Sequence, residues 1–189
     1  MLGTIVNSTT IIVGTILGVL LNKGIKEEYK STIMDGVSLA VILIGIMGAL
    51  DTENVILMII SLVVGSIIGE AVKIEKKLDN LGNTLEKKLG KGDSNFSKGF
   101  VTASLVFCVG AMAIVGALES GLRGNHSTLF AKSVLDGISS IIFASTLGIG
   151  VGFSAATVLL YQGSITLLAS SAKELLTPEV INEMSAVGG

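Results

Sequence analysis

The chain has 189 residues, half of them hydrophobic, with 13 Lys and Arg against 15 Asp and Glu and a mean hydropathy of +0.79. This composition excludes an ordinary soluble domain, because a chain of this length cannot bury every helix on all sides. The net charge of −2 gives no basic bias toward nucleic acid, and the single Cys108 cannot form an internal disulfide. A bilayer core about 30 Å thick needs about 20 apolar residues per helix, so the long uncharged stretches predict membrane spans.

Six membrane-spanning helices are predicted. In chain order they cover 2–21, 32–50, 54–72, 99–118, 129–150 and 153–172. The first has no basic segment before it and no small-residue cleavage pattern after it, so we expect a retained span rather than a signal peptide. Many of the 24 glycines lie within these stretches, where small residues let membrane helices approach closely. GTILG (14–18) and GSIIG (65–69) are packing motifs of this kind.

The two halves of the chain carry similar strings in the same order. The matched pairs are GTIVNSTTIIVG (3–14) with GFVTASLVFCVG (99–110), IMDGVS (33–38) with VLDGIS (134–139), and VVGSI (63–67) with YQGSI (161–165). Three matches in one order predict the duplication of a three-span unit. Because an odd number of spans makes the second copy enter from the opposite side, the copies would form an inverted-topology repeat, which is common in channels and secondary transporters.

Basic residues predict the orientation. Ten of the 13 Lys and Arg lie in the 22–31 loop and the 70–98 linker, and Arg123, Lys132 and Lys173 lie on the opposite side. The positive-inside rule therefore places the linker in the cytoplasm and the N-terminus outside. Within the linker, apolar residues recur every three or four positions between Lys and Glu, which predicts an amphipathic surface helix. Those residues are Ile74, Leu78, Leu81, Leu85 and Leu89.

The predicted fold class is therefore an all-α integral membrane protein. We expect a first three-span repeat over 1–72, a cytoplasmic amphipathic linker over 73–98 and a second three-span repeat over 99–176. An interfacial tail over 177–189 should follow, with Pro178 starting a short helix.

Several strings resemble the YqgA/YdfK family of bacterial inner-membrane proteins. They are GTIVN near the start, SLVVGSIIGE, FVTASLVFCVGAMAIVGAL, AKSVLDGISS and YQGSITLLA. The resemblance covers essentially the whole chain. It implies a multi-pass bacterial inner-membrane protein in a largely uncharacterised family, whose members have been described as candidate sodium channels or pumps. Members tend to run on into another apolar segment, so we expect SAVGG (185–189) to be the truncated start of a further span.

Asp35 and Asp136 occupy the same place in the repeated string. Acids within membrane spans are rare and usually functional. Each lies near the start of its predicted span, where a carboxylate can cap free N–H groups at the positive end of the helix dipole. Helix capping and contact with an ion or solute are therefore both open. Inversion places the two acids near opposite faces of the membrane, so we do not expect one shared site at the midplane.

Other polar residues within the spans complete a candidate pathway. Asn7 lies in a polar cluster of the first span, Thr102 and Ser104 lie at matching depth in the fourth, and Gln162 lies in the sixth. Hydrogen bonding between helices is the alternative for each of them. The Gly-rich string TLGIGVGF (146–153) predicts either a tight turn between two spans or an unwound segment that lines a cavity.

The sequence has no P-loop, nucleophile elbow or metalloprotease helix, and no group of metal ligands surrounds His126. We therefore expect no enzyme activity, no cofactor and no metal site. The expected function is a channel or ion-coupled transporter for a small cation, Na⁺ or H⁺. The alternatives are transport of a small polar organic solute and a non-transporting scaffold that docks a partner through the 73–98 helix. The lipid bilayer and the transported species are the expected partners, and a homodimer would enclose a path that six thin spans leave open.

Overall fold

The computed structural model describes residues 1–21, 24–50, 52–73, 76–77, 80, 83–84, 95–169, 171 and 177–188. These residues form α1 (Leu2–Leu20), α2 (Glu27–Leu50), α3 (Val55–Val72), α5 (Asn95–Cys108), α6 (Ala111–Leu122), α7 (Ser127–Leu147), α8 (Gly150–Ala169) and α9 (Pro178–Gly188). In this part of the chain, α1, α2, α3, α7 and α8 are long and apolar enough to cross a membrane, and the bent pair α5–α6 is a sixth candidate. An all-helical membrane architecture is confirmed, while the inverted repeat stays a prediction.

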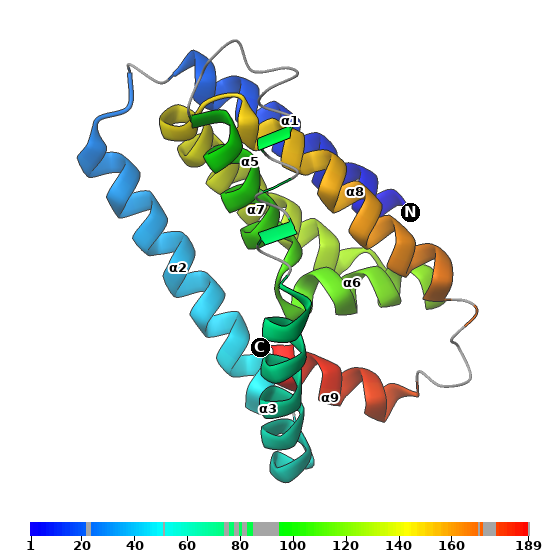
Figure 1. Cartoon of the computed structure of the whole chain (residues 1–189). Helices are drawn as coiled ribbons and strands as arrows, with labels where there is room; N and C mark the ends of the chain where they lie inside the picture. The colour runs from blue at the N-terminus through cyan, green and yellow to red at the C-terminus, as the bar shows by residue number, and fades with distance from the viewer. Residues whose placement is uncertain are drawn as a thin grey trace.

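Helices α1, α5, α7 and α8 lie side by side as a bundle (Figure 1). Small residues let α1 approach α7 closely. A Cβ at Gly14 would lie 2.5 Å from the carbonyl oxygen of Gly137, and one at Gly18 would lie 2.9 Å from the Cβ of Ala144. The GTILG packing motif is therefore confirmed. The GSIIG motif differs, because nothing within the described residues comes within 4 Å of a Cβ built at Gly65.

The packing contacts also define helix directions. α1 and α7 run the same way, because Gly3 packs against Leu129 near the start of α7 and Gly18 packs near its end. α8 runs the opposite way, because Gly152 near its start packs against Thr15 near the end of α1. These are the relative directions that alternating spans require when the α5–α6 pair crosses the membrane as the fourth span.

The predicted fourth span, 99–118, is not one straight helix. α5 ends at Cys108, α6 begins at Ala111, and the two helices are bent by 59°. Gly110 has φ +131° at the break, a backbone conformation that only glycine adopts readily. The pair is a broken span or a re-entrant segment. Hydropathy could not reveal the break, because the stretch is apolar on both sides of it and glycine is common in every span.

A tight turn joins α7 to α8. α7 ends at Leu147, Gly148 has φ +76°, and α8 begins at Gly150. Of the two alternatives for 146–153, the tight turn is confirmed.

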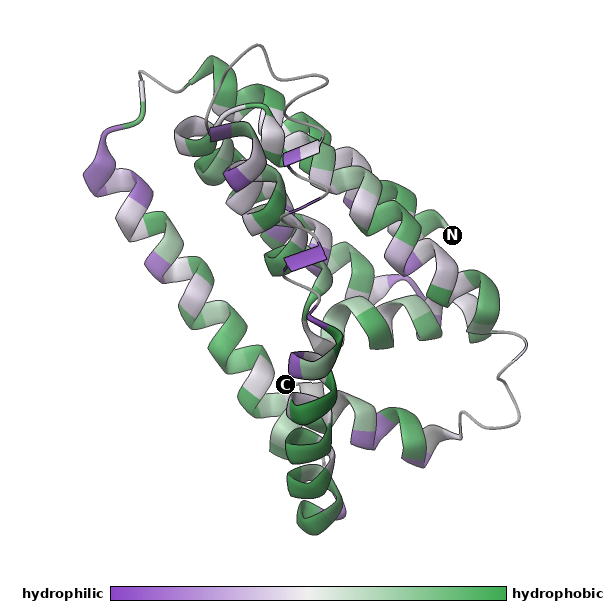
Figure 2. Cartoon of the chain, in the orientation of Figure 1, coloured by the Kyte–Doolittle hydropathy of each residue, from purple (hydrophilic) through white to green (hydrophobic). Residues whose placement is uncertain are grey.

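Helices α2 and α3 stand apart from the bundle (Figure 1). Neither buries any of its 18-residue apolar window against the rest of the described chain. Figure 2 shows hydrophobic residues along most of α3. Lys30 holds the start of α2 near the bundle, since its ammonium donates to Glu27 at 2.7 Å and to the hydroxyl of Thr146 on α7 at 3.4 Å. Apolar helices exposed in this way are suited to lipid.

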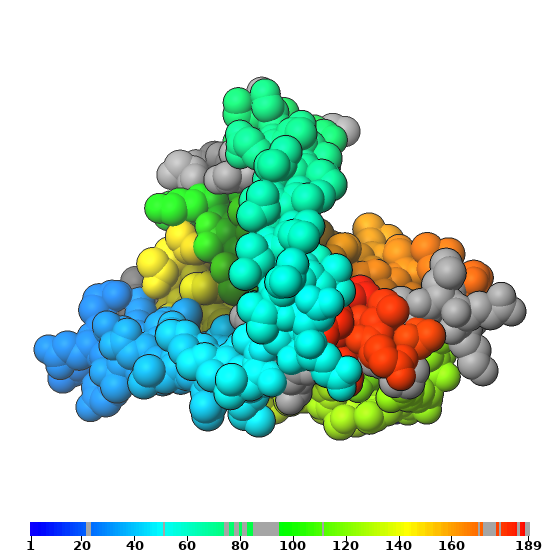
Figure 3. Space-filling view, turned by 90° about the horizontal axis from the view of Figure 1, so that it is seen from below, coloured from blue at the N-terminus to red at the C-terminus, as the bar shows by residue number. Residues whose placement is uncertain are grey.

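Helix α9 packs on α2, α3 and α6, and Figure 3 shows it in red beside α3. It begins at Pro178 as predicted. The carboxylate of Glu183 accepts hydrogen bonds from the Thr52 hydroxyl at 2.7 Å and the Glu53 N–H at 2.9 Å. The predicted linker helix cannot be compared, because its five apolar positions lie outside the described residues.

Candidate functional site

The two acids of the repeated string lie in different environments. Asp136 is buried near the middle of α7 (Ser127–Leu147), whereas Asp35 is exposed, well inside α2 (Glu27–Leu50). Neither lies in a first helical turn, so the capping interpretation is wrong for both. α7 begins at Ser127, and just before it the side chain of Asn125 accepts from the Ser127 N–H at 3.1 Å and from its hydroxyl at 2.8 Å. Such a side-chain acceptor is a helix-start signal.

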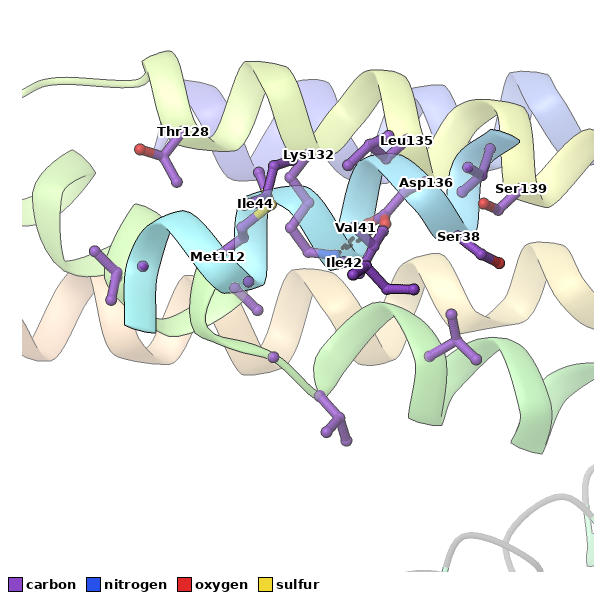
Figure 4. A pocket seen from close by; sticks show the side chains of 18 of the residues that line it. Ser38, Val41, Ile42, Ile44, Met112, Thr128, Lys132, Leu135, Asp136 and Ser139 are labelled. Carbon is purple, nitrogen blue, oxygen red and sulfur yellow. Dashed lines mark hydrogen bonds and ion pairs between the residues drawn. The ribbon is translucent and has the colours of Figure 1, made fainter. Parts of the chain in front are cut away.

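Lys132 is the partner of Asp136. Its Nζ lies 2.8 Å from Oδ2 and 2.9 Å from Oδ1, and the two side chains are only 7% and 8% exposed. The pair is drawn in Figure 4. The prediction that Lys132 lies on the outer side of the membrane as a topology-determining charge is wrong, because α7 buries it within the bundle. The signal that could have found this pair is the four-residue spacing of Lys and Asp on one helix face.

Helices α1 and α8 add two amides to the pair. Asn7 Nδ2 donates to Asp136 Oδ2 at 3.0 Å and makes a longer contact of 3.5 Å with Gln162 Oε1. Both amide side chains are fully buried. The close approach of α1 to α7 across Gly14 and Gly18 places Asn7 within reach of the carboxylate. The structure thus brings three of the predicted pathway residues together, from three helices.

Several buried polar atoms on the two helices that supply the amides lack a hydrogen-bond partner in the described part of the chain. They lie on α1 and α8, and they are Asn7 Oδ1, Gln162 Nε2 and the hydroxyls of Thr4, Ser8, Thr15 and Thr166. Burying a polar atom without a partner is unfavourable by about 1–3 kcal/mol. All but the Gln162 nitrogen are oxygens, the ligands that hard cations take. α1 therefore presents oxygen atoms to the bundle interior beside a carboxylate.

The two predicted residues on α5 have different surroundings. Ser104 is buried and donates to the Thr157 hydroxyl of α8 at 3.2 Å, which is the helix–helix hydrogen bond weighed as its alternative role. Thr102 is half-buried. Neither belongs to the hydrogen-bonded cluster of Asp136 as the described residues define it, so their place in a pathway stays a prediction.

A cavity of about 690 Å³ opens beside the ion pair. Its walls come from α2, the α5–α6 break and α7, and they are mainly apolar. Lys132 and Asp136 lie on one wall, and Ser38 and Ser139 add hydroxyls (Figure 4). Because Asp136 lines the cavity and also contacts Asn7, the carboxylate lies between the cavity and the amides of α1 and α8.

Comparison with known proteins gives a consistent family assignment. The family described as "Protein of unknown function (DUF554)" matches residues 2–189. Over 193 residues the chain is 37% identical to "Uncharacterized membrane protein YdfK" of Bacillus subtilis (strain 168), covering 100% of this chain and 82% of that protein. Over 195 residues it is 31% identical to "Uncharacterized protein YqgA" of Escherichia coli (strain K12), with the same coverage. No solved structure matches. The resemblance seen in the sequence is confirmed.

Proposed function

The chain belongs to the DUF554 family and is a membrane protein, and we propose that it is a channel or ion-coupled transporter for a small cation, Na⁺ or H⁺, in the bacterial inner membrane. The observation that carries the proposal is the Lys132–Asp136 pair, buried inside a bundle of membrane-spanning helices. Ionisable residues in such positions are unfavourable and commonly mark ion pathways.

The pair supports exchange of one positive charge for another. A buried carboxylate needs a compensating charge, and Lys132, a proton or a metal cation can each supply it. An arriving cation takes the carboxylate of Asp136, and the Lys132 ammonium, on its flexible stem, turns toward the cavity that it already lines. When the cation leaves, the ammonium returns. The carboxylate is compensated at each stage, and the displaced ammonium is hydrated in the cavity while the cation is bound.

The surrounding oxygens suit the same exchange. A sodium ion that loses water needs several oxygen ligands, and Asn7 Oδ1 and the Ser8 hydroxyl are unpartnered in the described structure. A proton needs only an oxygen of Asp136. Both species are therefore compatible with the cluster, and a dependence of flux on a Na⁺ gradient or on pH separates them.

Flux into proteoliposomes tests the proposal. Na⁺ flux is measured as radioactive Na⁺ uptake, and H⁺ flux as the signal of a trapped pH-sensitive dye. Wild type is compared with the double variant Lys132→Met/Asp136→Asn. The control is Glu70→Gln, which removes a carboxylate from an exposed position of α3. Wild type and the control should transport, and the double variant should fall to the rate of protein-free liposomes. Wild-type liposomes that leak neither Na⁺ nor H⁺ faster than empty ones would contradict the proposal.

The cavity favours a second candidate, a transporter of a small polar organic solute. Its volume of about 690 Å³ far exceeds what a bare ion needs and lies within the range of roughly 300–1,000 Å³ for small-molecule pockets. A solute with an ammonium and a carboxylate could pair with Asp136 and Lys132 in place of their mutual bridge. Saturable uptake of a labelled zwitterion that competes with cation flux would favour this candidate.

A further inference from the structure

A second cavity, of about 750 Å³, lies against the same helix break. Its walls come from α3, α9 and the α5–α6 break, whereas α2 and α7 wall the first cavity. Val109 and Gly110 belong to the lining of both cavities. The break therefore lies between a cavity that contains the Lys132–Asp136 pair and one that does not.

Building on the proposed function, we infer that the two cavities are halves of one aqueous cation route, and that Val109 is the side chain that closes it. Val109 directly follows α5 and is 71% exposed. Its N–H donates to the Leu105 carbonyl at 2.9 Å, which ties it to the end of that helix. A rotation of this one residue changes the opening between the cavities without moving a packed helix.

The backbone beside Val109 has a conformation that glycine adopts readily, and no described residue crowds it. A Cβ built at Gly110 meets nothing within 4 Å in the described chain, so its φ of +131° rather than crowding requires glycine there. The helices on either side are tightly packed. A Cβ at Gly99 of α5 would lie 3.0 Å from the Leu147 carbonyl oxygen, and one at Gly121 of α6 would lie 2.7 Å from the Ala169 Cβ. The break is therefore an uncrowded joint between two closely packed helices, α5 and α6.

Charges on both sides of the break favour a cation. The second cavity is lined by Glu179 and Glu183 of α9, and hydrogen bonds from Thr52 and from the backbone hold the pKa of Glu183 below its ordinary value, so it is ionised at neutral pH. The C-terminal end of α5 brings carbonyls with partial negative charge to the break, and the N-terminal end of α6 brings N–H groups with partial positive charge. The preference for a cation therefore rests on the carboxylates of the two cavities. On the other side of the break, Asp136 lines the first cavity and is paired with Lys132.

Cysteine labelling tests the route. In a Cys108→Ser background, Val109→Cys is compared with Val63→Cys on α3. Val63 is also exposed on the protein surface, at 55%, but lines neither cavity. The probe is a quaternary-ammonium methanethiosulfonate, which reacts with a thiolate in contact with water. A cysteine in a wet route should react about tenfold or more faster than one facing lipid. Labelled Val109→Cys should also lose its Na⁺ flux.

Each outcome bears on the inference. Labelling of Val109→Cys no faster than that of Val63→Cys would overturn it, because position 109 would then face lipid or be closed to water. Complete labelling with unchanged Na⁺ flux would also overturn it, and the proposed function would stand. Fast labelling of a protein that shows no wild-type flux would support the aqueous route and defeat the proposed function instead.

Discussion

Replacing Asp136 by Asn should destabilise the protein. Lys132 Nζ lies 2.8 Å from Asp136 Oδ2, with both side chains more than nine-tenths buried. At an effective dielectric constant of about 20, this attraction amounts to about 6 kcal/mol before the unfavourable desolvation of both charges is subtracted. Asn keeps the shape of Asp but leaves the ammonium buried and unpaired. Removing one partner of a buried pair typically costs about 3–5 kcal/mol.

Thermal unfolding in detergent measures this loss. For a chain of this size, each kcal/mol lowers the midpoint by about 2–4 °C, so Asp136→Asn should unfold about 6–20 °C below wild type. Asp35→Asn is the matched control, because the same substitution in the same string falls on the exposed face of α2. Asp35→Asn leaves no buried ammonium unpaired and removes a charge from a membrane-spanning helix, so it should be neutral or stabilising. Adding Lys132→Met to Asp136→Asn should restore most of the stability, because exchanging a whole buried pair for neutral groups is often close to neutral.

Two results would refute this reasoning. If Asp136→Asn unfolded at the wild-type temperature, the cavity would stabilise the ammonium as well as the carboxylate does, and the ion pair would not contribute to stability. If the double variant were no more stable than Asp136→Asn, the loss would come from the contact with Asn7 rather than from the stranded charge.

Three further predictions use the same unfolding and flux assays. Gly14→Ala should lower the free energy of unfolding by about 1–3 kcal/mol, because its Cβ would meet the α7 backbone. Gly65→Ala, in open space, should leave it unchanged or raise it by up to about 1 kcal/mol. Equal effects of the two substitutions would contradict the close α1–α7 contact. Gly110→Ala should reduce Na⁺ flux while destabilising by only about 1–2 kcal/mol, and unchanged flux would count against a joint at the break. Hydrogen bonds, chiefly from Thr52, lower the pKa of Glu183 in the folded protein. The Glu183 carboxylate therefore stabilises the fold above the unfolded-state pKa of about 4.3, and this stabilisation is lost as the pH falls through the pKa of the folded state. The difference in unfolding temperature between wild type and Glu183→Gln should therefore close in acid, and a difference that persists there would argue against the pKa shift.

The sequence by itself determined the membrane spans. Bilayer thickness sets the length of an apolar helix, and the length of each apolar stretch can be read from the sequence. Five of the six predicted spans are therefore continuous helices in the described chain, within a few residues of their predicted bounds. The same patterning singled out Asn7, Asp136 and Gln162, because polar residues stand out within apolar stretches. Local composition could not reveal the break at Gly110, since the stretch is apolar throughout and only the backbone angle distinguishes this glycine from Gly99 and Gly116 in the same stretch.

Only the tertiary structure decided which copy of the repeated string forms the site. IMDGVS and VLDGIS are locally almost the same, and each lies within a helix. Asp136 is buried because α1 packs against α7 and brings Asn7 to it across 129 residues of sequence, a contact that Gly14 permits. Asp35 lies on a helix that buries none of its apolar window against the described chain, so it stays exposed. Burial depends on neighbours that are distant in the chain, and for that reason two similar strings acquire different chemistry.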